Sequence, residues 1–184
     1  MAVMPRVPAL EYSSLSSEQQ RIYNDIAGSR NTVGGPFAIW LRMPELAAAA
    51  TQLGNTIRLN NKLGRRRQEL VILIQARTWS AAYAWVTHKQ AGLEAGLSPA
   101  VIEAIEAQRQ PDFEDEGERL IYDVVTELNE RRVLADPTYQ RALDALGLEV
   151  LIELITTAGF YTLVMMMLDA FDVPAAGGAP SPFG

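Results

Sequence analysis

RRRQELVILIQARTWSAAYAWVTH, residues 65–88, is the stretch that decides the fold of this chain. Its apolar positions recur with the period of an α-helix, first up to Trp79 and again after Ser80. Ser80 is a residue type that commonly caps a helix N-terminus. The stretch therefore predicts two consecutive helices, over residues 64–79 and 80–96, and the short connection between them implies that they pack against each other.

The rest of the chain shows the same helical periodicity, and no convincing strand pattern is present. Ser16 followed three residues later by Gln19 is a capping-box pattern, which marks a helix start. We therefore predict an all-α fold of about seven or eight helices. The expected organisation is one domain, residues 1–184, with a core at about 15–173 and a Pro/Gly-rich tail at 174–184.

The last predicted helix, residues 149–173, is apolar on nearly all sides, so it needs cover on all sides. In a chain this small we expect a second subunit to supply that cover, which predicts a homo-oligomer. Its uncharged apolar stretch, residues 154–168, is fifteen residues long, against the ~20 that span a bilayer. We therefore expect a buried helix and no membrane partner. The N-terminus lacks the apolar core of a signal peptide, so the cytoplasm is the expected location.

Composition excludes several chemistries. The chain has 184 residues, a net charge of −6, no Cys and one His. Nucleic-acid binding needs a basic face, so we expect no nucleic-acid partner. Without Cys there is no disulfide, no thiolate nucleophile and no Cys-based zinc site. A single His also rules out a His-rich metal site within one chain. We expect no metal and no cofactor.

His88 is that single histidine. On a helix it shares a stripe with Ala81 and Trp85, where the alanine leaves space. A lone His beside aromatic residues is either a hydrogen-bonded core residue or a catalytic one. Glu69, one helix earlier, begins an apolar run and can reach His88 if the two helices are antiparallel. A carboxylate beside a histidine fixes its tautomer and builds a general acid or base.

A basic run precedes the Glu69 helix. RLNNKLGRRR, residues 58–67, contains five basic side chains and no acidic one. The run is either a solvated helix start or a site for a small carboxylate.

The spacing of Glu69, Ala81, Ala84 and His88 matches a known motif. It is the Glu-x11-Cys-x2-Cys-x3-His spacing of the alkyl hydroperoxidase D-like (AhpD-like) peroxidases, with both cysteines replaced by alanine. The chain therefore resembles the carboxymuconolactone decarboxylase family, in its Cys-less branch, over nearly its whole length. Relatives in that branch often carry Glu where this chain has Ala84, so one candidate acid is missing here.

The resemblance implies an AhpD-like helical bundle, assembled as a trimer or a multiple of trimers such as a hexamer. It also implies an active pocket between the Glu69 helix and the His88 helix. Thiol peroxidase activity is excluded, because the reacting sulfur is absent. The decarboxylases of the family act without a cysteine pair. They remove a carboxylate from an unsaturated lactone during breakdown of aromatic acids.

On this basis we predict His88 and Glu69 as catalytic residues, with His88 as the acid that protonates a carbanion. One of the three arginines at positions 65–67, or Arg77, would anchor a substrate carboxylate. The full set of predicted substrate-binding residues is Trp85, Tyr83, Trp40, Arg66 and Arg77.

Two functions remain open at this stage. The first is a cofactor-independent lyase, decarboxylase or isomerase that acts on a small carboxylated or lactone metabolite of aromatic-compound breakdown. The second is a non-catalytic small-ligand-binding or structural oligomer. Ala81 and Ala84 favour the second function. Glu69 and His88 favour the first, although such a pair can also be a structural link between two helices.

Overall fold

The computed structural model describes residues 5–30, 33–59, 61–175 and 179–183, and in these ranges the regular secondary structure is all helical. The elements in chain order are η1 Tyr12–Ser14, α1 Ser17–Arg30, α2 Pro36–Trp40, α3 Pro44–Leu59, α4 Arg65–Thr78, α5 Ala82–Glu94, α6 Pro99–Glu106, α7 Glu116–Arg131, α8 Asp136–Leu146 and α9 Leu148–Ala170. The all-α prediction is confirmed. Apart from the five-residue α2, the eight remaining α-helices agree with the predicted number.

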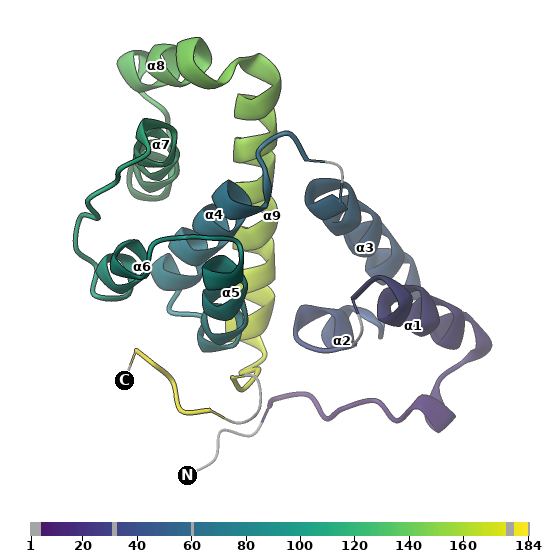
Figure 1. Ribbon diagram of the computed structural model, residues 1–184. Helices are drawn as coiled ribbons and strands as arrows, with labels where there is room; N and C mark the ends of the chain where they lie inside the picture. The colour runs from purple at the N-terminus through teal and green to yellow at the C-terminus, as the bar shows by residue number, and fades with distance from the viewer. Residues whose placement is uncertain (1–4, 31–32, 60, 176–178, 184) are drawn as a thin grey trace.

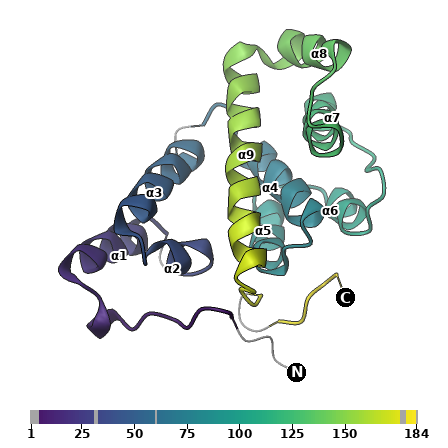
Figure 2. The same cartoon turned by 180° about the vertical axis from the view of Figure 1, so that it is seen from behind.

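α9 runs through the middle of the molecule. Helices α4 to α8 lie on one side of it and α1 to α3 lie on the other (Figures 1 and 2). α4 packs against α9 on one flank and against α5 and α7 on others. Its residues 68–76 are all buried, so the middle of α4 is part of the core and has no solvent face. Each large apolar side chain buried there contributes about 1.5–3 kcal/mol.

The two predicted helix starts have different outcomes. The capping box is present, because the Gln19 amide donates to Ser16 Oγ at 3.2 Å and the Ser16 amide donates to Gln19 Oε1 at 3.0 Å. The Ser80 prediction is wrong, since α5 is capped by Ala81. Ser80 has φ 53°, and its hydroxyl accepts a hydrogen bond from Arg77 Nη1 at 3.1 Å. The connection between α4 and α5 is so short that Ser80 lies in the turn and does not cap α5.

α9 has a covered side and an exposed side. Its inner residues, which include Leu154, Tyr161 and Met165, are buried. The exposed large apolar residues of its outer side are Leu148, Ile152, Ile155, Leu163 and Met166. By length and composition alone α9 could cross a membrane, although core helices of soluble proteins pass the same test. In this fold α9 contacts α2, α3, α4, α7 and α8.

The predicted tail is described in part, because 176–178 and 184 lie outside the described residues. Near its end, the Phe183 ring meets Trp85 edge to face, with 5.4 Å between ring centroids. The guanidinium carbon of Arg77 lies 4.5 Å from the Phe183 ring centroid. The surface of α4 and α5 therefore holds this part of the tail.

Candidate active site

The packing of α4 against α5 brings the two predicted catalytic residues together. Glu69 Oε2 lies 2.6 Å from His88 Nδ1, so the predicted contact is confirmed. The Glu69 side chain is 1% exposed and that of His88 is 10% exposed. A carboxylate oxygen is the natural acceptor for an Nδ1–H group, and in that tautomer the second ring nitrogen, Nε2, points away from Glu69.

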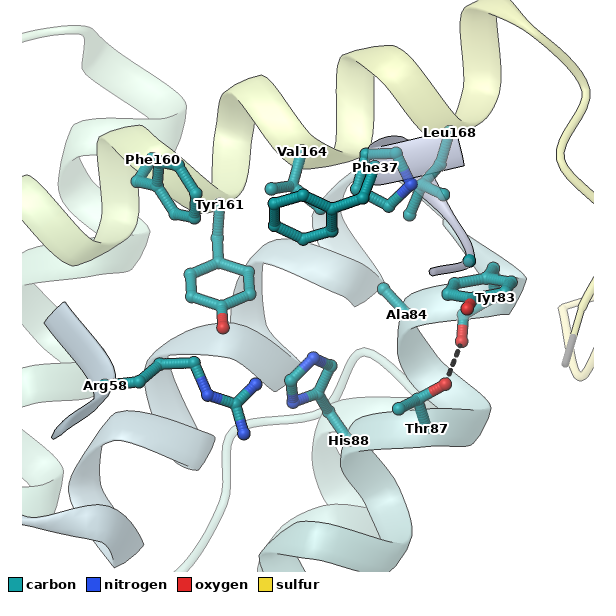
Figure 3. A pocket seen from close by; sticks show the side chains of 12 residues that line it. Phe37, Arg58, Tyr83, Ala84, Thr87, His88, Phe160, Tyr161, Val164 and Leu168 are labelled. Carbon is teal, nitrogen blue, oxygen red and sulfur yellow. Dashed lines mark hydrogen bonds between the residues drawn. The ribbon is translucent and has the colours of Figure 1, made fainter. Parts of the chain in front are cut away.

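His88 opens onto a cavity of about 150 Å³. The cavity is lined by α5, α9, the start of α2 and the end of α3, and in Figure 3 α9 runs along one side of it and α5 along the other. Its lining residues are Gly34, Pro36, Phe37, Arg58, Tyr83, Ala84, Thr87, His88, Phe160, Tyr161, Val164 and Leu168. This differs from the expected pocket between the Glu69 and His88 helices. The buried face of α4 packs tightly on α5, so Glu69 stands behind His88 and does not line the cavity.

The cavity has a polar end and an apolar side. In Figure 3 the Arg58 guanidinium and the Tyr161 hydroxyl point toward the His88 imidazole, while Phe37 and Val164 lie on the opposite side. The Tyr161 ring meets the His88 ring edge-on, with 5.5 Å between centroids and an angle of 87° between planes. No Asp or Glu is among the described lining residues. The cavity therefore favours an anionic group at its polar end.

Tyr83 lines the cavity, where the sequence placed it. Burial raises the pKa of its hydroxyl, so Tyr83 stays protonated at neutral pH. Gly35 makes room for the ring. It has φ 57°, and a Cβ at this position would lie 2.7 Å from Tyr83 Cε1. The Gly-Gly turn before α2 is thus part of the cavity wall.

The structure corrects the two predicted tryptophans. The cavity face of α5 consists of positions 83, 84, 87 and 88, and Trp85 projects from the neighbouring face toward Phe183. Trp40 is 3% exposed and packs edge to face on Phe37 at 5.2 Å between centroids. Trp85 and Trp40 are core residues outside the cavity lining. A helical stripe identifies neighbours on one helix, but it does not show which side faces a cavity.

The two predicted arginines are also engaged away from the cavity. Arg66 Nε lies 2.5 Å from Glu118 Oε1. Arg77 Nε donates to the carbonyl of Glu106 at 2.8 Å, and its guanidinium covers Phe183. Neither arginine lines the cavity. Arg58, at the end of α3, takes that place. The signal that could have found it is the basic run, which begins at Arg58.

Ala84 lines the cavity, whereas Ala81, 1% exposed, is buried outside the lining. Across the part of the chain that the structure describes, no three His, Cys, Asp or Glu side chains are grouped to hold a metal ion. The polar groups at this site are the His88–Glu69 pair, the Arg58 guanidinium and the tyrosine hydroxyls.

Comparison with known proteins supports the same fold. The profile of the carboxymuconolactone decarboxylase family matches residues 44–127, a range that contains Glu69 and His88. No curated protein matches the chain by sequence.

Several solved structures share the fold. An uncharacterised peroxidase-related protein from Silicibacter sp. TM1040 is 14% identical, with a TM-score of 0.77, over 96% of this chain and 93% of that one. One from Ralstonia eutropha JMP134, described as an alkylhydroperoxidase AhpD core, is 15% identical with a TM-score of 0.77, over 97% and 94%. The debrominase Bmp8, in complex with 2,3,4-tribromopyrrole, is 14% identical with a TM-score of 0.75, over 94% and 92%. At these identities the likeness establishes the fold alone.

Proposed function

We propose that this chain is an enzyme whose own side chains perform the chemistry. The support is the match of residues 44–127 to the carboxymuconolactone decarboxylase family, together with the shared fold. The enzyme acts as a decarboxylase or isomerase on a small carboxylated or lactone metabolite of aromatic-compound breakdown. His88 is the proton donor and Glu69 is the residue that orients it.

One observation carries this proposal. The His88 ring lines the cavity, and on its buried side Glu69 Oε2 lies 2.6 Å from Nδ1. A carboxylate in this position fixes the ring orientation and offsets positive charge on the imidazolium. The Nε2 atom can then hold a proton and deliver it to a molecule in the cavity.

The proposed decarboxylation proceeds as follows. The bond between the substrate carbon and its carboxylate breaks, and CO₂ leaves. The electron pair moves into a conjugated carbonyl of the substrate as an enolate. His88 Nε2–H then protonates the carbon, and the neutral imidazole regains a proton from solvent. In the isomerisation, the same nitrogen removes a proton at one carbon and returns it at another.

A single-ring ligand in a protein of the same fold is consistent with the proposed substrate class. The debrominase that shares the fold was solved with 2,3,4-tribromopyrrole, which is a single-ring compound. Debromination is not proposed for this chain. Thiol peroxidase chemistry is likewise not proposed, because the chain contains no cysteine and the reacting group of such enzymes is a sulfur.

The second candidate is a non-catalytic small-ligand-binding or structural oligomer. Ala81 and Ala84, at the positions of the motif cysteines, favour it. In that case Glu69 and His88 serve as a buried link between α4 and α5, and the cavity binds a ligand without converting it.

Activity of His88→Gln distinguishes the two candidates. Purified protein is incubated with a panel of five-membered lactone acids, and released CO₂ is measured together with the thermal unfolding midpoint. We expect release by the wild-type protein and its loss in His88→Gln, with both proteins folded. Arg65→Gln, a surface change outside the cavity lining, is the matched control. Absence of turnover across the panel favours the binding protein.

We also propose a homo-oligomer, a trimer or hexamer, that functions in the cytoplasm. The support is the exposed apolar side of α9, which a second copy would cover. Sedimentation at micromolar concentration tests the assembly, and a monomer would contradict it.

A further inference from the structure

We infer that Arg58 binds the carboxylate of a single-ring substrate and that this carboxylate remains on the product. The inference rests on the proposed function, because it names the substrate class of the same cavity. It replaces the arginines expected from the sequence with one that reaches the cavity.

The size of the cavity limits the ligand. Its volume is about 150 Å³. An apolar protein cavity of about that volume holds one benzene molecule. The apolar side chains Phe37, Val164 and Leu168 can therefore surround one five- or six-membered ring. A larger compound would extend from the cavity through its open side.

The charges of the basic run single out Arg58. Four of its five basic residues pair with acids. Lys62 pairs with Glu149, Arg65 with Glu94, Arg66 with Glu118 and Arg67 with Asp115. Within the described residues, Arg58 has no ion pair, and it is the member of the run that lines the cavity. Its guanidinium points toward the polar end (Figure 3), where a carboxylate would receive two parallel hydrogen bonds.

The position of Arg58 also decides which group reacts. An arginine that binds a carboxylate stabilises it as an anion in the ground state and so opposes its loss as CO₂. The carboxylate at Arg58 is therefore the one that is kept. A substrate that undergoes decarboxylation here carries a second carboxylate near His88. A substrate with one carboxylate undergoes proton transfer only.

Calorimetric binding of benzoate and of its neutral isostere benzamide tests the inference directly. The full chain is titrated at low ionic strength as wild type, Arg58→Gln, Arg58→Lys and Arg65→Gln. We expect the wild type to bind benzoate at least tenfold more tightly than benzamide. Arg58→Gln should lose at least tenfold in benzoate affinity and leave benzamide unchanged. Arg58→Lys should retain part of the preference, and Arg65→Gln all of it. Far-ultraviolet circular dichroism verifies that each variant is folded.

Three results would overturn the inference. They are no benzoate binding by the wild type, equal affinity for benzoate and benzamide, and an Arg58→Gln variant that binds benzoate as the wild type does. Failure of the proposed function is a separate outcome. If benzoate binding depends on Arg58 but no lactone acid is converted, the site is a carboxylate-binding site without catalysis. If Arg58→Gln converts lactone acids with the wild-type KM, the proposed enzymatic function is retained and the proposed role of Arg58 is rejected.

Discussion

Glu69 and Glu118 are two buried carboxylates, with 1% and 2% of each residue exposed, and each faces a basic side chain. Arg66 binds both oxygens of Glu118, through Nε at 2.5 Å and Nη2 at 3.1 Å. Glu69 contacts one ring nitrogen of His88, and that ring lines a cavity. The two carboxylates are similarly buried, yet the pairs differ in what lies beyond the basic group.

The difference shows what makes a buried pair a candidate for chemistry. The Arg66–Glu118 pair joins α4 to α7, and its contacts use both carboxylate oxygens. The His88–Glu69 pair joins α4 to α5 and leaves one nitrogen directed away from Glu69. Burial of a carboxylate therefore does not identify a reactive site. A reactive site is identified by a polar atom that a buried partner orients toward a cavity.

The largest expected effect is on turnover when Glu69 loses its charge. In Glu69→Gln the amide still accepts a hydrogen bond from Nδ1, but it no longer offsets charge on the imidazolium. We expect CO₂ release from a converted lactone acid to fall by about 10²–10⁴-fold, with benzoate affinity within a few-fold of wild type. Steady-state kinetics and calorimetry on the same preparation measure both. Unchanged kcat would place the Glu69 pair in the same structural class as the Glu118 pair.

Disruption of the Glu118 pair should act on stability instead. Arg66→Met leaves a buried carboxylate without its partner, which we expect to lower the free energy of unfolding by about 2–3 kcal/mol. This is below the range for fully buried pairs because the Arg66 side chain is 45% exposed. Urea unfolding measures the change, and turnover should remain at the wild-type level. Turnover that falls with Arg66→Met in folded protein would remove the distinction between the two pairs.

A smaller effect is expected at the wall of the cavity. Gly35→Ala places a Cβ 2.7 Å from Tyr83 Cε1 at a backbone position with φ 57°. We expect a loss of about 1–2 kcal/mol in unfolding free energy and weaker benzoate binding, because the Tyr83 ring must move. Gly64→Ala is the control. Its φ is 82° and its Cβ would meet nothing within 4 Å, so it carries backbone strain alone. Benzoate binding that weakens equally in both variants would contradict the account of Tyr83.

The smallest effect is a pH dependence of stability that comes from Asp169, a residue outside the cavity lining. Loss of hydration and, secondly, the negative charge of Asp172 raise the pKa of Asp169 to about 6. A raised carboxyl pKa lowers stability as pH rises from about 4 through 6, because the unfolded chain ionises first. Asp169→Asn should therefore be more stable than wild type at pH 7.5 and about equal at pH 3.5. Since Asp169 is exposed, we expect less than about 1 kcal/mol, measured by thermal unfolding. An equal difference at both pH values would contradict this assignment.

The helix pattern of residues 65–88 was sufficient to predict α4, α5 and the contact between Glu69 and His88, because that contact depends on two neighbouring helices and a short turn. The cavity depends on α2, α3 and α9, which lie far from α5 in sequence. Arg58 and His88 line the same cavity only through that tertiary arrangement. Trp85 was predicted as a lining residue because it shares a helical stripe with His88, and Trp40 was predicted with it, but both belong to the core. Periodicity does not reveal which face of a helix borders an empty space.

The central claim is that Glu69 holds Nδ1 of His88 while Nε2 meets the ligand. His88 is the chain's one histidine. The two imidazole ¹⁵N signals of the protein therefore belong to it, and no assignment by mutation is needed. Long-range ¹H–¹⁵N correlation spectra should show a proton on Nδ1 before and after addition of benzoate at a concentration that saturates the calorimetric binding. The Nε2 signal should move on binding. A ring with its single proton on Nε2, or a ring whose signals do not change at saturation, would contradict the account.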